Sequence, residues 1–257
     1  MIENFKRGGL EKFGLDYASV AAANPGVVYC SVTGFGQDGP RASEPGYDFI
    51  IQGMGGIMDL TGEPDGAPQK AGVAIADLFT GLYGTIAVQA ALALRARTGL
   101  GQHVDMSLFD CQLAMLANQA ANHLIGGRAP RRLGNAHPNI APYQVFEAAD
   151  GPLVVACGND GQFARLCEAL GLALHRDPRF ARNRDRVGNR AALLDALAPE
   201  IARRPRAGIL AAMARAGVPA GPINTVAEAF RDPQAIHRGA AQTIGGSTAP
   251  RPPMRFS

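Results

Sequence analysis

The sequence has few charged residues and no block of a single charge. Charged residues make up 18% of the 257 residues, and the formal net charge is only +3. Because this charge is small and scattered, it gives no support to nucleic-acid binding, and it suits an anionic small ligand equally well. We therefore expect no nucleic-acid partner.

The sequence also lacks paired cysteines. None of its four cysteines belongs to a C-x-x-C motif or lies near histidines at a zinc-binding spacing. In a chain of this length, such a pattern is typical of reduced thiols in a cytoplasmic protein. We expect a cytoplasmic location and no bound metal. The cysteines are Cys30, Cys111, Cys157 and Cys167.

Long hydrophobic segments are missing too. The opening "MIENFKRGGLEKFG" (1–14) has no apolar region of the kind found in signal peptides. The most apolar stretch (78–94) is short and contains Thr80, Thr85 and Gln89. This composition favours a buried core helix over a membrane span, so we expect no membrane partner.

Glycines with the spacing G-x-G-x-x-G follow an apolar segment in "VVYCSVTGFGQDGP" (27–40). A dinucleotide-binding loop requires such glycines to open a helix whose N-terminus meets the pyrophosphate. Here Pro40 and Pro45 follow instead. We interpret the segment as a strand that ends in a glycine-rich turn, without a dinucleotide cofactor.

Hydrophobic periodicity and turn residues predict two α/β domains. The first would span residues 1–142, and a smaller one would span 143–230 with a hairpin that turns at Asp150-Gly151. Residues 231–257 would return toward the large domain. The expected strand is 27–33, the expected helices are 17–23, 77–96, 108–125, 160–170, 190–203 and 205–216, and "AGVPAGPIN" (216–224) is expected to be a turn.

The segment "GQHVDMSLFDCQLAML" (101–116) changes from the alternation of a strand to the period of a helix. Ser107 and Asp110 form an S-x-x-D pattern that is typical of a helix start. Asp110 is also a candidate nucleophile, because a carboxylate at a positive helix end can attack an activated acyl carbon such as that of a thioester. Backbone N–H groups of "GMGG" (53–56) and "LGNAHP" (133–138) are candidates for holding the resulting oxyanion.

Eight stretches, taken together and in order, resemble the family III CoA-transferases, the group that contains formyl-CoA transferase and carnitine CoA-transferase. They cover nearly the whole chain. They are "ENFKRGGLEKFGLDY" (3–17), "NPGVVYCSVTGFGQDGP" (24–40), "GYDFIIQGMGGIMDLTG" (46–62), "GVAIADLFTGLYG" (72–84), "TGLGQHVDMSLFD" (98–110), "LGNAHPNIAPYQVF" (133–146), "GNDGQFARLCEALG" (158–171) and "AGVPAGPIN" (216–224).

This resemblance implies a partial doubly wound, Rossmann-like large domain, a smaller α/β domain and an interlocked homodimer. It implies that Asp110 attacks an acyl-CoA, forms an aspartyl anhydride, and passes CoA through an aspartyl-CoA thioester to a carboxylic acid acceptor. Coenzyme A is then a substrate, and no cofactor is expected. Succinate or another short dicarboxylate would be a suitable acid.

The resemblance also assigns further site residues. CoA contacts fall on Asn4, Phe5, Lys12 and Phe13, for which a solvated lysine and core aromatics are the structural alternative. The active-site loop falls on Gly134, Asn135 and His137, and His137 is as well explained by a structural role as by a substrate contact.

Arginines contribute two further patterns. The arginine-rich segment 175–190 resembles a solvated face of the family. Arg128, Arg131 and Arg132 lie beside the predicted loop and are weaker candidates for contact with an anionic substrate.

Two alternatives stay open at this stage. A 2-methylacyl-CoA racemase of the same superfamily needs two acid–base groups, and here Tyr47 replaces its histidine although Asp105 matches its aspartate. Family members are also longer at both ends, which suggests a truncated chain. A catalytically inactive fragment that is stable only with a partner is the second alternative.

Overall fold

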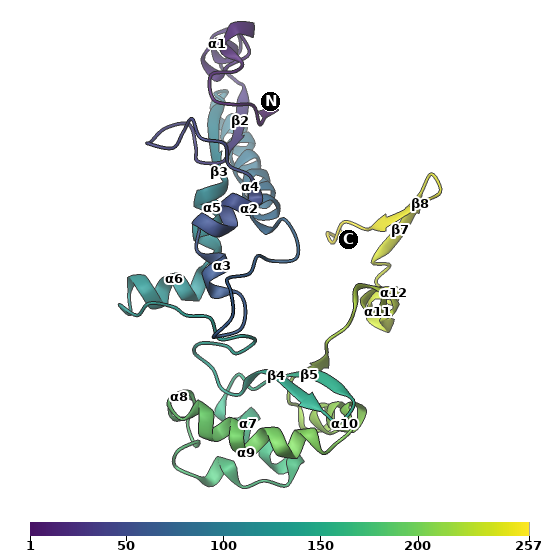
Figure 1. The fold of residues 1–257 in the computed structure, drawn as a ribbon. Helices are drawn as coiled ribbons and strands as arrows, with labels where there is room; N and C mark the ends of the chain where they lie inside the picture. Colours follow the sequence, from purple (N-terminus) through teal and green to yellow (C-terminus); the bar gives the residue numbers. More distant parts are fainter. Residues whose placement is uncertain (257) are drawn as a thin grey trace. The chain divides into compact units, whose positions relative to one another are not determined.

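The structure is a computed structural model that describes residues 1–256. The chain divides into two compact units, Met1–Gly134 and Asn135–Ser257. Each is described by itself, and Figure 1 shows their elements. The predicted domains 1–142, 143–230 and 231–257 stay predictions.

The first unit contains a parallel sheet of three strands in the order β1-β2-β3. Strand β2 pairs with both neighbours, Val28 lies opposite Gln102, and Thr33 lies opposite Ser107. The predicted α/β class with a parallel sheet is therefore confirmed. The elements are β1 (Ile2–Glu3), η1 (Glu11–Phe13), α1 (Tyr17–Ala23), β2 (Val28–Thr33), α2 (Asp48–Met54), α3 (Ile57–Leu60), α4 (Ile75–Thr98), β3 (Gln102–Ser107), α5 (Leu108–Met115) and α6 (Ala117–Leu124).

Two details of this unit differ from the sequence-based expectation. Strand β1 was not expected, because two residues are too short to show a periodic pattern. The single helix expected over 108–125 is divided into α5 and α6, because Ala117, the first residue of α6, has a positive φ of 46° that interrupts a continuous right-handed helix.

Helix α4 packs on β2, β3 and α5, with Ala76, Thr80, Gly84 and Ala91 as its buried residues. Leu78, Leu82 and Ile86 are 57%, 61% and 65% exposed. The expectation of a buried core helix is therefore wrong for most of its surface. By length and composition α4 could cross a membrane, but a helix of a soluble protein passes the same test.

The second unit packs helices on an antiparallel sheet of order β4-β5-β6. The predicted hairpin is confirmed, with Ala148 opposite Gly151, but part of the predicted turn 216–224 is strand β6. The elements are β4 (Tyr143–Ala148), β5 (Gly151–Ala156), α7 (Asp160–Leu170), η2 (Leu174–Arg176), α8 (Asn183–Gly188), α9 (Arg190–Ala202), α10 (Arg206–Ala216), β6 (Ala220–Pro222), α11 (Val226–Arg231), α12 (Pro233–His237), β7 (Ala241–Ile244) and β8 (Ser247–Pro250).

Candidate active site

The carboxyl ends of β2 and β3 lie side by side, because Thr33 and Ser107 are paired in the parallel register. The glycine-rich turn follows β2 and helix α5 follows β3. The two are joined by a hydrogen bond of 3.0 Å from the backbone N–H of Phe109 to Gly34 O. Ligands of open α/β sheets bind beyond this edge, so the edge is where we look for chemistry.

Asp110 lies in the first turn of α5, at this edge. Its backbone N–H donates to Ser107 Oγ over 3.1 Å, so Ser107 caps the helix as the S-x-x-D pattern predicted. Asp110 itself is an exposed residue. Capping uses the backbone N–H of Asp110, whereas nucleophilic attack would use its side-chain carboxylate, so the two roles are compatible.

The glycine-rich turn is organised by side chains of the neighbouring strands. Gly36 N–H donates to Thr33 Oγ1 and Gln37 N–H donates to Asp105 Oδ2, both over 2.9 Å. Gly36 has a φ of +88°, which favours glycine. After β2 ends at Thr33, the next helix is α2, which begins only at Asp48, so the interpretation as a turn is confirmed. Asp105, the counterpart of the racemase aspartate, holds this turn in place.

A cleft of about 880 Å³ adjoins the parallel sheet. Asn4 and Phe5 line it at one side, and Tyr47, Asp48 and Asp77 line it elsewhere. Asp48 is a structural carboxylate, because its Oδ1 accepts a hydrogen bond of 2.8 Å from the backbone N–H of Ala76 at the start of α4. Burial, and secondarily the charge of Asp48, raise the pKa of Asp77.

The two phenylalanines among the predicted CoA contacts are not core residues. Phe5 is 60% exposed and Phe13 is 64% exposed. Lys12 Nζ lies 4.9 Å from the centroid of the Phe13 ring. Lys12 and Phe13 lie in η1 and do not line the cleft that Asn4 and Phe5 line. The structural alternative of core aromatics is therefore wrong, while the predicted CoA contacts stay a prediction.

The "GMGG" segment is less suited to hold an oxyanion than its glycines suggested. The N–H of Gly55 is already committed to Ile51 O at 2.7 Å, where it ends α2. Gly55 has a packing role instead, since a Cβ there would collide with the side chain of Gln112. Gln112 is fully buried, and within residues 1–256 both polar atoms of its amide lack a partner. Sequence reasoning missed this residue because its burial depends on how α2 and α5 pack.

The predicted active-site loop spans the boundary between the two units. In the first unit, Gly134 has a φ of +55° and its N–H donates to Gly62 O over 3.1 Å. The second unit begins at Asn135, and in it the His137 N–H donates to Tyr143 O over 2.9 Å. Two N–H groups of this loop are therefore engaged by backbone carbonyls.

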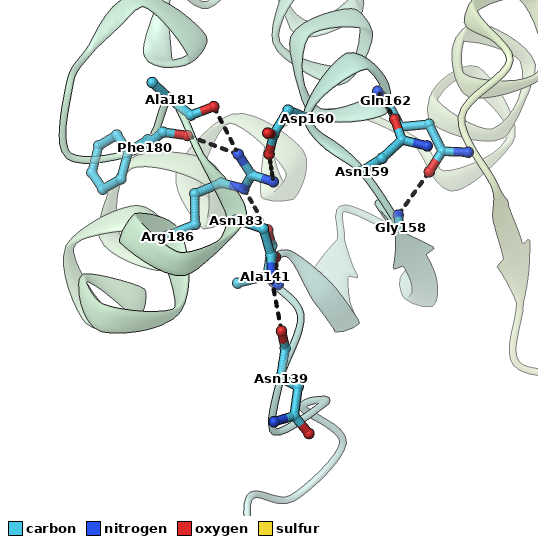
Figure 2. A network of polar contacts seen from close by, with 10 residues as sticks. All are labelled: Asn139, Ala141, Gly158, Asn159, Asp160, Gln162, Phe180, Ala181, Asn183 and Arg186. Carbon is cyan, nitrogen blue, oxygen red and sulfur yellow. Dashed lines mark hydrogen bonds and ion pairs between the residues drawn. The ribbon is translucent and has the colours of Figure 1, made fainter. Parts of the chain in front are cut away.

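Arginine side chains fix the chain just after this loop, as Figure 2 shows for Arg186. The Arg186 guanidinium donates to Ala141 O (2.6 Å), Phe180 O (2.9 Å) and Asp160 Oδ1 (2.7 Å). Its side chain is fully buried. The expectation of a solvated face over 175–190 is therefore wrong at Arg186. These acceptors bind the guanidinium and so allow it to be buried, whereas in the sequence Arg186 looks like the other arginines of this segment.

The arginines beside the loop differ among themselves. Arg132 pairs with Asp59, with Nη1 to Oδ1 at 2.9 Å, whereas Arg128 and Arg131 are exposed. Their contact with an anionic substrate stays a prediction.

The four cysteines are free and buried, and burial raises the pKa of Cys111, which lies next to Asp110. In the part of the chain that the structure describes, no cluster of three or more His, Cys, Asp or Glu could hold a metal ion.

Comparison with known proteins identifies the class. The family described as CoA-transferase family III matches residues 1–257. The chain belongs to this family, so the resemblance seen in the sequence is confirmed.

Individual relatives have narrower names. A succinate–glutarate CoA-transferase of Agrobacterium fabrum is 55% identical over 93% of this chain and 60% of its own length. An acetyl-CoA:oxalate CoA-transferase of Acetobacter aceti is 42% identical over 100% of this chain and 67% of its own length. A succinyl-CoA:glutarate CoA-transferase of Mus musculus is 40% identical over 100% of this chain and 60% of its own length. The chain thus spans about three fifths to two thirds of these relatives.

Solved structures agree on the fold. A CAIB/BAIF family protein from Brucella suis matches with a TM-score of 0.84 and 60% identity, over all of this chain and 68% of its own. The Rv3272 protein from M. tuberculosis matches with a TM-score of 0.89 and 27% identity, over all of this chain and 68% of its own.

Proposed function

We propose that this chain carries the catalytic residue of a CoA-transferase, which moves CoA from an acyl-CoA to a carboxylic acid. The observation that supports this most is the exposed Asp110 at the N-terminus of α5, in a chain that belongs to CoA-transferase family III. A carboxylate there is accessible and lies at the edge of the sheet where ligands bind.

The proposed reaction begins when an Asp110 carboxylate oxygen attacks the thioester carbonyl carbon. The C–S bond breaks, CoA leaves as the thiolate, and a mixed aspartyl anhydride remains. The thiolate then attacks the aspartyl carbonyl carbon, which releases the donor acid and forms an aspartyl-CoA thioester. The acceptor carboxylate then attacks the aspartyl-CoA carbonyl carbon, so that CoA leaves again as the thiolate and a second mixed anhydride forms. The thiolate attacks the acceptor's carbonyl carbon in this anhydride, which releases the new acyl-CoA and regenerates the Asp110 carboxylate. The anhydride conserves the energy of the thioester, so no further energy source is needed.

The substrate binding residues belong to the same proposal. Asn4, Phe5, Lys12 and Phe13 would contact CoA, with Lys12 as a point charge for a phosphate. Their support is the exposure of both phenylalanines and the place of Asn4 and Phe5 at the cleft. We propose that the loop of Gly134, Asn135 and His137 also serves the reaction.

The proposed acids are short dicarboxylates such as succinate and glutarate. Relatives at 55% and 40% identity are named for these acids. The relative at 42% identity is named for oxalate, which is also a dicarboxylate. All three relatives are thus named for at least one dicarboxylic acid, which supports a dicarboxylate as a substrate of this chain.

We further propose an interlocked homodimer, a doubly wound arrangement of the large domain, and a cytoplasmic location. Exposed apolar residues of α4 support a covering partner, since single apolar residues are normal on a surface but a row of them is not. Free cysteines support a reducing compartment.

The racemase alternative is less well supported. It requires two acid–base groups, but Tyr47 stands at one position, and Asp105 accepts a hydrogen bond from the glycine-rich turn. The names of the relatives also favour transfer over racemisation.

Hydroxylamine trapping tests the proposal directly. Purified protein is incubated with succinyl-CoA and hydroxylamine, and the peptide 102–116 is analysed by mass spectrometry. We expect a hydroxamate on Asp110 that is absent from Asp110→Asn. Turnover by Asp110→Asn should fall by on the order of 10³-fold or more.

Two negative results have different meanings. An unmodified Asp110 in a folded protein that binds CoA contradicts the anhydride mechanism and favours the racemase. An unmodified Asp110 without CoA binding indicates that this chain alone is inactive.

A further inference from the structure

The C-terminal part of the second unit contains a second cleft, of about 480 Å³. Helices α11 and α12 and the hairpin of β7 and β8 make up this part of the chain, which Figure 1 draws in yellow. A hydrogen bond of 2.8 Å from Arg251 N–H to Ala240 O joins the chain after β8 to the chain before β7. All the residues that line the cleft lie in the segment 224–255, so the cleft is complete within one unit.

Positive side chains predominate around this cleft. Arg238, Arg251 and Arg255 line it, and Asp232 is the one carboxylate among the lining residues that the structure describes. Asp232 already caps α12, because its Oδ1 accepts a hydrogen bond of 2.7 Å from a backbone N–H in the first turn. Glu228, the other acidic residue of the segment 224–256, forms the capping box of α11. Both carboxylates therefore stabilise helix starts, and the cleft keeps three arginines against one aspartate.

The three guanidinium groups have no acceptor in the chain itself. Within residues 1–256, Arg238, Arg251 and Arg255 form no salt bridge and no side-chain hydrogen bond. Arg231 of the same segment differs, because its Nε donates to Ala227 O over 3.1 Å. Each guanidinium has five N–H donors, and like charges around one cleft repel one another. An anion in the cleft would satisfy these donors and offset the repulsion.

The backbone restricts where these arginines lie. Two prolines (252–253) separate Arg251 from Arg255, and proline fixes φ and has no N–H. This wall of the cleft is therefore stiff and lacks two backbone donors, so recognition of an anion there falls to the arginine side chains. Arg251 Nη1 lies 3.7 Å from the position of a Cβ on Gly239. The Arg251 guanidinium is thus beside the residue that follows Arg238.

We propose that this cleft binds an anion that carries a phosphate or diphosphate group, through the guanidinium groups of Arg238, Arg251 and Arg255. The parallel N–H donors of a guanidinium match two oxygens of a phosphate, and the charges strengthen each hydrogen bond. A carboxylate has two oxygens and suits one such pair, whereas a phosphate or diphosphate has oxygens for several guanidiniums at once. This site does not rest on the proposed acyl transfer.

Calorimetric titration of the full chain with inorganic pyrophosphate measures the binding. We expect the Kd to rise by about tenfold or more in Arg238→Gln and in Arg251→Gln, as for the loss of a hydrogen bond between charged groups. The control Arg231→Gln removes an arginine of the same segment that does not line the cleft, and it should leave the Kd unchanged. No binding by the unmodified protein, or an equal loss in Arg231→Gln, would overturn the proposal.

The proposed CoA contacts need a control of their own, because a site for the phosphates of CoA would also bind pyrophosphate. Lys12→Gln should weaken the binding of CoA and leave the Kd for pyrophosphate unchanged. If Lys12→Gln abolishes the binding of pyrophosphate and Arg238→Gln does not, the anion binds at the proposed CoA contacts and this inference fails. If instead no hydroxamate forms on Asp110, the proposed function fails, yet the pyrophosphate titration still tests the cleft.

Thermal denaturation separates a binding role from a structural one. Without ligand, Arg238→Gln and Arg251→Gln should not lower the Tm, because neither guanidinium has a partner within residues 1–256. Pyrophosphate should raise the Tm of the unmodified protein and have little effect on the Tm of these variants. A lower Tm of both variants without ligand, together with an unchanged Kd, would show a structural role and contradict the proposal.

Two further probes define the ligand. Adenosine diphosphate that binds more tightly than pyrophosphate, with the same dependence on Arg238, would support a phosphate group on a larger molecule. Equal binding of the two would support a free anion. Succinate serves as the carboxylate probe, and succinate that binds as tightly as pyrophosphate with the same dependence on Arg238 would overturn the assignment to phosphate.

Discussion

The two units of this chain differ in how completely they bury their apolar residues. The second unit has one continuous buried cluster that joins β4, β5, α7, α9 and α10, and includes Leu153, Phe163, Leu193 and Ile209. The first unit has two small clusters: Cys30, Met106 and Cys111 form one, and Ile51, Ala76 and Leu108 form the other. The second unit therefore contains its own core, and the first does not.

The first unit shows what an incomplete core leaves exposed. Helix α4 is apolar on most of its surface, but the unit covers only one side of it. A helix that is apolar all round is normally enclosed, because apolar surface in water costs about 25 cal/mol per Å². The stability of the first unit should therefore depend on what covers it, while that of the second should depend on internal contacts.

The largest expected effect compares an internal leucine with an exposed one. Leu193→Ala removes a fully buried side chain of the second unit and should lower the free energy of unfolding by about 2–5 kcal/mol. In the monomeric chain, where Leu82 of α4 is exposed, Leu82→Ala should change it by no more than about 0.5 kcal/mol. Urea denaturation measures both. A cost for Leu82→Ala as large as that for Leu193→Ala would show that α4 is covered in solution.

The buried and exposed arginines of the second unit give the next effect. Arg186→Met leaves Ala141 O and Phe180 O without their donor and should cost about 3 kcal/mol. The control Arg179→Met removes a surface pair, Nη2 to Asp177 Oδ2 at 2.7 Å, and should cost less than about 1 kcal/mol. The same denaturation experiment applies, and equal costs would contradict a structural role of Arg186.

Buried thiols make the second unit sensitive to alkaline pH. Burial raises the pKa of Cys157 to about 12 and that of Cys167 to about 11, from 9.0 in an exposed thiol. The folded state therefore keeps protons that the unfolded state loses, and stability is full below pH 9 and falls as pH rises toward 11. Each cysteine contributes a slope of about 1.4 kcal/mol per pH unit.

Cys157→Ala tests this by comparison with the unmodified protein over the same pH range. Other titrating groups are common to both proteins, so the difference in slope isolates Cys157. Identical slopes would mean that the Cys157 thiol is not shielded from water.

The smallest expected effect concerns the buried amide of the first unit. Gln112→Leu removes two unsatisfied polar atoms and should raise the free energy of unfolding by about 1 kcal/mol. The control Gln89→Leu changes an exposed residue of α4 and should stay within about 0.5 kcal/mol. Destabilisation by Gln112→Leu would contradict this and would mean that the amide of Gln112 has a hydrogen-bond partner. The first unit would then pair its buried polar group, as the second unit pairs Arg186.

Sequence patterns predicted the elements that local chemistry specifies. The helix start at Ser107, the hairpin after Asp150 and the helix end at Gly171, which has a φ of +76°, agree with the structure. Periodicity failed at strand β1, at the break before Ala117 and at β6, where tertiary pairing outweighs local preference. Asp110 could be proposed from the sequence, but nothing in the sequence distinguished Arg186 from its exposed neighbours.

The sequence by itself determined the α/β class, the family and the candidate nucleophile, because these depend on residue order and on a motif that caps its own helix. Tertiary structure decided which polar groups are buried and paired. Burial depends on residues far apart in the chain, such as Gly55 over Gln112, or Ala141 and Asp160 around Arg186. The role of Arg186 therefore follows from the folded chain, in which its guanidinium binds Ala141 O.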